Sequence, residues 1–218
     1  MGFLDRFKKA PQPTAANQVN LIYELLFCDN IALYKTHNQN PIVYPWNILL
    51  AESNNNSELQ QIIDDTSLET RAKILAYHKL RTAGASIDKI ELMAVIVEVG
   101  MDAGLDVLAS FKDGTARYLN HSGNMIIWDT ATTDSNELIR QLFDEGLKIV
   151  QQIGPWDKAR RPQPTSGNAR ISFLVSDGLY FGEAPINTLF NDPLAARALQ
   201  AATSLMQYLT AHAIRKSN

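Results

Sequence analysis

The stretch ELMAVIVEVGM, residues 91–101, decides the fold class. Its apolar side chains occupy odd and even positions alike, which is typical of a central strand that is covered on both faces of its sheet. The next run, 105–111, alternates between apolar and more polar side chains, as expected of a half-buried strand. Asp113-Gly114 follows directly, and an Asp-Gly pair between alternating runs indicates a hairpin. The sequence therefore predicts an antiparallel neighbour for the central strand.

Short strands and two long helices fill the rest of the C-terminal half. A second Asp-Gly pair, Asp177-Gly178, predicts a second hairpin. The expected strands are 91–101, 105–111, 115–120, 125–129, 170–176 and 179–184, and the expected helices are 134–153 and 192–214. Since strands and helices do not alternate, a doubly wound parallel sheet is not expected. We predict the α+β class: a predominantly antiparallel sheet, meander plus hairpin, with long helices packed largely on one face.

An N-terminal helical region precedes this sheet. Apolar side chains recur with helical spacing over 17–28 and again over 67–83. Thr66 and Glu69 have the spacing of a capping box at the start of the second helix, and Gly84 stands where that helix should end. Between the two helices the chain is rich in turn residues, with 42–44 as a candidate short strand.

Three segments follow from these changes of pattern. We expect residues 1–16 to form a mobile amphipathic N-terminal segment, in which Phe3, Leu4 and Phe7 would share one side before two prolines. Residues 17–84 form the helical region and residues 85–218 the α+β domain. Length alone does not decide whether 17–218 is one compact domain.

Composition narrows the class of protein. The 218 residues carry a net charge of −3 and include a single cysteine, Cys28, so an intrachain disulfide is impossible. No run approaches the roughly 20 apolar residues of a membrane span, and the charged N-terminus lacks a signal-peptide core. Duplex nucleic-acid binding is not expected, because it needs a basic face. We expect a cytoplasmic protein, with weak peripheral membrane contact through residues 1–9 left open.

No motif for catalysis or for a cofactor is legible in the chain. It lacks a phosphate-binding glycine pattern, a nucleophile elbow and paired cysteines, and its four histidines are scattered. We therefore expect no metal and no cofactor, and the sequence favours a protein that is not an enzyme.

Arg117 and Trp128 are the first candidate binding residues. A two-residue loop at Asp113-Gly114 would place Ser110 opposite Arg117, and the next strand would bring Trp128 beside Arg117. Such a pair on an exposed sheet face could form a cation–π contact and a recognition patch. A structural cross-strand pair is the alternative.

The second candidate is the loop after the 134–153 helix. It carries Trp156 together with Lys158, Arg160 and Arg161. An aromatic ring among three cations could bind an acidic partner, a phosphate group or RNA. The alternative is a solvated connection between a helix and a strand.

Glu98 interrupts the central strand and is the third candidate. If it is buried, desolvation would raise its pKa and a partner would be needed, which is common at functional sites. Alternatively, the strand has already emerged into solvent near Gly100.

Three functions are compatible with these features. The first is a non-enzymatic interaction or regulatory module that binds a protein partner or a second copy of itself. The second is a small-ligand-binding domain with a pocket between sheet and helices, and the third an enzyme of unrecognised type that uses buried carboxylates. A cavity at Glu98 would favour the enzyme, an apolar pocket the ligand-binding domain, and an exposed patch around Trp128 or Trp156 the partner-binding module.

Overall fold

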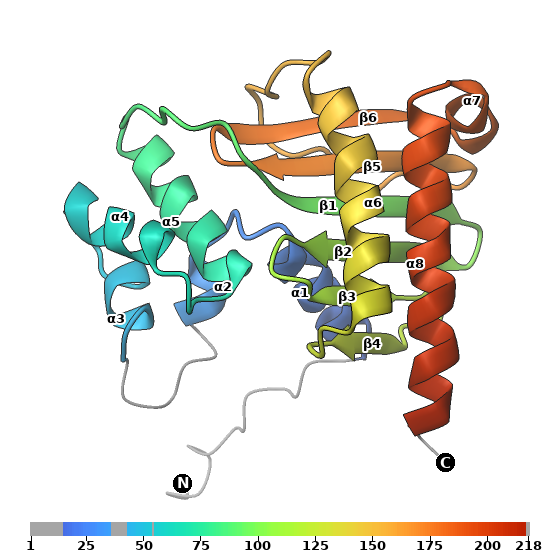
Figure 1. Ribbon diagram of the computed structural model, residues 1–218, viewed down its shortest axis with the longest axis horizontal. Helices are drawn as coiled ribbons and strands as arrows, with labels where there is room; N and C mark the ends of the chain where they lie inside the picture. The colour runs from blue at the N-terminus through green and yellow to red at the C-terminus, as the bar shows by residue number, and fades with distance from the viewer. Residues whose placement is uncertain (1–14, 36–42, 54, 217–218) are drawn as a thin grey trace, which may run out of the picture.

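The computed structural model describes residues 15–35, 43–53 and 55–216 (Figure 1). Most of the expected segment 1–16 and residue 42 of the candidate short strand lie outside this range, and the two described residues of that strand, Val43 and Tyr44, are not in a strand. The described helices are α1 (Ala15–Leu26), α2 (Ala32–Lys35), α3 (Trp46–Leu49), α4 (Asn56–Asp64), α5 (Thr70–Thr82), α6 (Thr133–Val150), α7 (Ile186–Asn191) and α8 (Ala195–Lys216). The described strands are β1 (Leu92–Met101), β2 (Gly104–Phe111), β3 (Ala116–Leu119), β4 (Met125–Trp128), β5 (Asn168–Val175) and β6 (Gly178–Pro185).

All six strands of the described chain form one sheet, in the order β4-β3-β2-β1-β5-β6. Every neighbouring pair is antiparallel. β1 occupies the middle, between β2 and β5, as its apolar run predicts. The predicted α+β class with an antiparallel meander and a second hairpin is confirmed.

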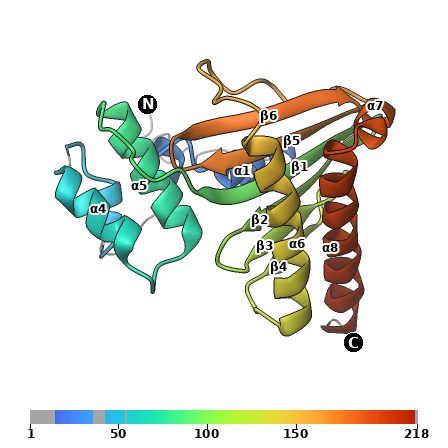
Figure 2. The same cartoon turned by 45° about the horizontal axis from the view of Figure 1, so that its top comes forward.

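Helices cover both faces of the sheet, which explains why β1 is apolar on both sides. α6 and α8 cross the front face in Figure 1, and α1 lies behind the sheet; Figure 2 shows the same layers from above. Val95 and Val97 point to the α6/α8 face and pack with side chains of those helices. Ile96 points to the α1 face. The long helices thus share one face, as predicted.

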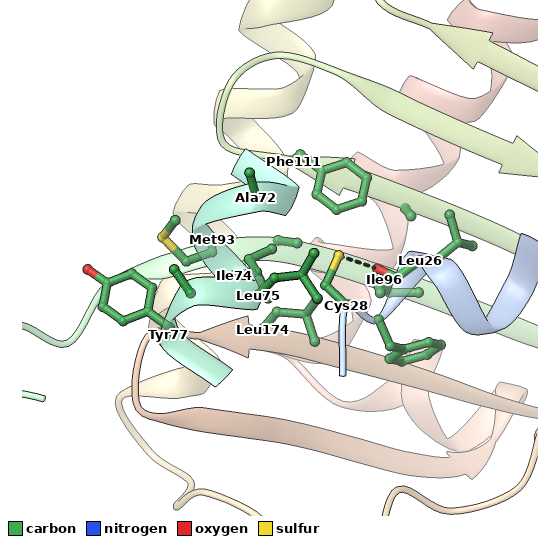
Figure 3. Packing of buried hydrophobic residues seen from close by; sticks show 14 of the residues in the cluster. Leu26, Cys28, Ala72, Ile74, Leu75, Tyr77, Met93, Ile96, Phe111 and Leu174 are labelled. Carbon is green, nitrogen blue, oxygen red and sulfur yellow. Dashed lines mark hydrogen bonds between the residues drawn. The ribbon is translucent and has the colours of Figure 1, made fainter. Parts of the chain in front are cut away.

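α3, α4 and α5 gather at one end of the sheet, at the left in Figure 1. Their buried side chains belong to the same cluster as those of the α1 face, and Figure 3 shows Leu75 of α5 among Ile96, Phe111 and Leu174 of the sheet. Cys28 is buried in this cluster, where desolvation raises the pKa of its thiol to about 12. The thiol is therefore protonated at neutral pH and packs as a small apolar side chain.

The start of α5 differs from the predicted capping box. Glu69 is the N-cap residue and its side chain makes no capping hydrogen bond. Instead, the backbone N–H of Thr70 donates to Asp113 in the β2–β3 turn at 2.7 Å, and the Thr70 hydroxyl accepts from the Asp113 N–H at 3.1 Å. Asp113 thus accepts the hydrogen bond from a backbone N–H that has no partner within the helix. Because Asp113 is distant in the sequence, the spacing of residues around α5 does not reveal this contact.

The β2–β3 hairpin is shifted by one residue from the predicted pairing. The N–H of Phe111 donates to the carbonyl of Thr115, which leaves three residues in the loop, and Gly114 has φ of 85°. Ser110 therefore faces Ala116, while Arg117 faces Ala109. Because side chains alternate along a strand, this shift puts Arg117 and its neighbours on the opposite face from the one predicted.

Candidate functional site

Arg117 and Trp128 do not form the predicted cation–π patch. Trp128 pairs with Ala116, so it points to the α6/α8 face, where it is 5% exposed and lies edge-to-face against Tyr208 at 5.6 Å. Arg117 points to the other face, forms an ion pair with Asp129 at 2.6 Å and is also buried. The β3–β4 pairing is the physical reason. Ile127, and not Trp128, faces Arg117, so the side chains of Arg117 and Trp128 point to opposite faces of the sheet.

The loop that carries Trp156, Lys158, Arg160 and Arg161, here called the basic loop, is held by Arg160 against α1 and the residues that follow it. The Arg160 guanidinium forms ion pairs with Asp29 at 2.8 Å and with Glu24, and lies 4.0 Å from the centre of the Phe27 ring. Only 14% of the side chain is exposed. Arg160 is therefore committed to contacts within the chain.

Trp156 and Lys158 stay at the surface, where they line a cleft of about 530 Å³ together with His78 of α5. The Trp156 ring packs edge-to-face on Phe181 at 5.0 Å, and the Lys158 ammonium lies 5.5 Å from the Trp156 ring centre. Burial lowers the pKa of His78. The binding role of Trp156 and Lys158 stays a prediction.

Glu98 lies inside the protein, on the α1 face, and is 0% exposed. The Tyr23 hydroxyl of α1 donates to one carboxylate oxygen at 2.7 Å, and the Ser172 hydroxyl of β5 to the other at 3.4 Å. Arg170, also in β5, lies 3.7 Å away. Desolvation by burial raises the pKa of Glu98, and Arg170 and Tyr23 oppose this. The strand does not emerge into solvent here.

Arg170 connects this carboxylate to the basic loop. It forms an ion pair with Glu183 of β6 at 2.8 Å and donates to the backbone carbonyls of Arg161, at 3.2 Å, and Pro162. Arg161 is half exposed and approaches Glu183 at 3.6 Å. Five clefts of the described chain are lined by other residues and not by Glu98. The cluster connects α1 and the loop to the sheet.

Replacing Glu98 with glutamine should change how stability depends on pH. The raised pKa means that the folded protein holds this proton to a higher pH than the unfolded chain, whose pKa is near 4.5. Glu98 therefore contributes most to the free energy of unfolding below pH 4.5, and this contribution is lost as pH rises through the raised pKa. Urea denaturation from pH 4 to 8 should show wild type losing stability relative to Glu98→Gln.

Glu137→Gln is the matched control for that series. Glu137 is exposed, and its contacts with Arg140 and Gln141 lower its pKa to about 2. Its contribution can change only at acidic pH, so wild type and Glu137→Gln should run parallel from pH 5 to 8. Parallel profiles for Glu98→Gln as well would mean that Arg170 keeps Glu98 ionised throughout.

The α6/α8 face carries a different kind of opening, a cleft of about 110 Å³ between the sheet, α7 and α8, which we call the α8 cleft. Its walls follow the periods of the elements that build them, every second residue on a strand and every third or fourth on a helix. The strands contribute Val97, Val99, Asp106, Leu108 and Tyr118, and the helices contribute Ile186, Phe190, Leu199, Ala202, Thr203 and Met206.

The polar groups of the α8 cleft are already hydrogen-bonded. The Tyr118 hydroxyl donates to Asp106 Oδ2 at 3.0 Å, and the backbone N–H of His121 donates to Oδ1 at 2.6 Å. The Thr203 hydroxyl donates to the Leu199 carbonyl within α8 at 2.8 Å. The surface of the cleft that remains accessible to a ligand is therefore mainly apolar.

Sequence reasoning missed the α8 cleft because its lining looks like ordinary core. Leu199, Ala202 and Met206 have the spacing of a buried helix face. α7, which supplies Phe190, was not predicted. The sequence contained one signal of the α8 cleft. Asp106 is a charged residue at one of the more polar positions of the 105–111 alternation, and it lies on the same face of the strand as Leu108.

The described residues contain no group of three or more His, Cys, Asp or Glu side chains that could hold a metal ion. None of the helices in the described ranges has both the length and the apolar character needed to cross a membrane. Neither a known family model nor a curated protein matches the sequence.

Proposed function

We propose that the protein is a non-enzymatic, cytoplasmic binding module and that the α8 cleft takes a small apolar ligand. One observation carries this proposal. The α8 cleft is lined mainly by apolar side chains and yet is open to water, with Phe190 44% exposed at it. A ligand that removes this surface from water gains about 25 cal/mol for each Å² of apolar area buried. The single, buried thiol of Cys28 is compatible with a reducing, cytoplasmic location and does not require one.

The size of the α8 cleft limits the ligand. A volume of about 110 Å³ is below the range of roughly 300–1,000 Å³ that holds drug-sized molecules. It approaches the cavities of about 150 Å³ that stay dry and bind benzene. The fitting group is therefore one aromatic ring or a short aliphatic chain, and the expected dissociation constant is on the order of 1 mM.

Thr203→Trp should abolish binding by filling the α8 cleft. Thr203 is an exposed residue of α8 whose side chain lines the cleft, so an indole there competes with the ligand without entering the core. Binding is measured by titrating ¹⁵N-labelled protein with 2-phenylethanol and following amide shifts. Wild type should show saturable shifts around Val97 and Leu199, and the variant should lose them.

Ser204→Trp provides the control. Ser204 is the next residue of α8, is exposed and makes the same hydrogen bond to the carbonyl four residues earlier, but it does not line the α8 cleft. This variant should bind as wild type does. Equal binding by all three proteins would place the ligand elsewhere, and absence of binding by wild type would refute the proposal.

A further inference from the structure

Building on the proposed function, we infer that the ligand of the α8 cleft carries a positively charged amine on its apolar body. Among the described residues that line this cleft, Asp106 alone carries a charge. Lysine, arginine and histidine are missing from that lining. The electrostatic preference of the site therefore comes from one carboxylate, and it favours a cation.

The carboxylate of Asp106 retains room for a further donor. Oδ2 accepts from the Tyr118 hydroxyl, and Oδ1 accepts from the N–H of His121 and lies 3.1 Å from its ring Nδ1. An ionised carboxylate offers about four acceptor positions, so these contacts leave one. The Asp106 side chain is 27% exposed, which places this position where solvent meets the cleft.

The position of Asp106 in the sheet puts the charge beside the apolar floor. Asp106 faces Val99 across the β1–β2 pair, and the next residue on the same side, Leu108, faces Val97. All four side chains line the cleft. A ligand whose hydrocarbon lies on Val97 and Leu108 would therefore reach the carboxylate with its polar end.

Two aromatic rings strengthen the preference for a cation. Tyr118 and Phe190 both line the α8 cleft, and the hydrogen bond from Tyr118 to Asp106 holds that ring beside the carboxylate. An ammonium group is attracted to the face of an aromatic ring and to a carboxylate at once. A ligand with a carboxylate of its own would meet Asp106 with no compensating cation in the lining, so acids are disfavoured.

The test compares three ligands that share one phenyl ring: 2-phenylethylamine, 2-phenylethanol and phenylacetate. We expect the amine to bind wild-type protein about fivefold to tenfold more tightly than the alcohol, and phenylacetate to bind most weakly. Asp106→Asn keeps the shape of the side chain and an acceptor oxygen for His121. In this variant the preference for the amine over the alcohol should be lost.

Asp134→Asn controls for the loss of one negative charge, since Asp134 is exposed in the first turn of α6 and does not line the cleft. It should keep the full preference for the amine.

Equal affinities of wild type for amine and alcohol would overturn the inference and leave the proposed function standing. A preference that survives Asp106→Asn would also overturn it. If none of the three ligands binds, the proposed function falls with it.

Discussion

Arg170→Met should lower the free energy of unfolding at pH 7 by about 3–5 kcal/mol, the usual effect of removing one partner from a buried ion pair. Arg170 is 2% exposed and lies between two carboxylates, Glu183 at 2.8 Å and the fully buried Glu98 at 3.7 Å. Methionine keeps much of the length but none of the charge, so both carboxylates lose their buried cation. Urea denaturation followed by circular dichroism measures the effect.

Arg140→Met separates burial from the mere presence of ion pairs. Arg140 also contacts two carboxylates, Glu137 at 2.7 Å and Asp144 at 2.6 Å, but it lies on the exposed side of α6 with 60% of its side chain in solvent. Exposed pairs contribute little, because water already solvates both charges. This change should leave stability almost as it was. A similar loss in both variants would show that Arg170 does not act through burial.

Gly100→Ala is expected to cost about 1–3 kcal/mol, as overpacking of a closely packed site does. A Cβ atom at Gly100 would lie 2.5 Å from the carbonyl oxygen of Pro164 and closer still to that of Thr165. Both contacts are to backbone, so no side chain can rotate away. The added methyl must push the 160–167 loop off the end of β1 and stretch the hydrogen bond from Gly167 N–H to the Gly100 carbonyl, now 3.0 Å.

Gly182→Ala tests whether that cost is specific to the contact. Gly182 also lies in a strand, β6, but a Cβ there would meet no atom within 4 Å. Its stability should be unchanged or slightly higher, because alanine restricts the unfolded chain more than glycine does. Thermal denaturation of the two variants side by side gives the comparison. Equal midpoints would contradict the close approach at Gly100.

The strands were predictable because the burial of one or both faces of a strand determines which of its positions carry apolar side chains. The central run 91–101 is apolar on both sides, and in the structure β1 is covered by α1 on one face and by α6 and α8 on the other. The register of the next hairpin was not predictable from Asp113-Gly114 alone. Loops of two and of three residues can both place Gly114 at positive φ, and they differ at Asp113. A type I′ turn would need positive φ there, but Cys28 is the only non-glycine residue of the described chain with positive φ.

The candidate residues show where local reasoning stops. Arg160 was a candidate cation of the basic loop and Arg170 the first residue of an expected strand, yet their partners, Asp29 and Glu98, come from distant segments. Residue type indicated that Glu98 would need a partner if buried, but not that Tyr23 would supply it. The α8 cleft arises only when α7 and α8 meet the sheet, and no single segment of the chain carries its signature.

The central place of β1 also has a consequence for synthesis of the chain. β1 to β4 can pair as soon as they leave the ribosome, because each is joined to the next by a short turn. β5, however, is made only after α6, and it brings Arg170, the cation that lies 3.7 Å from Glu98. Until then the nascent meander has an open edge along its most apolar strand and an unpaired carboxylate within it. A ribosome stalled before Asn168 would therefore present a half-sheet that is prone to pair with other chains.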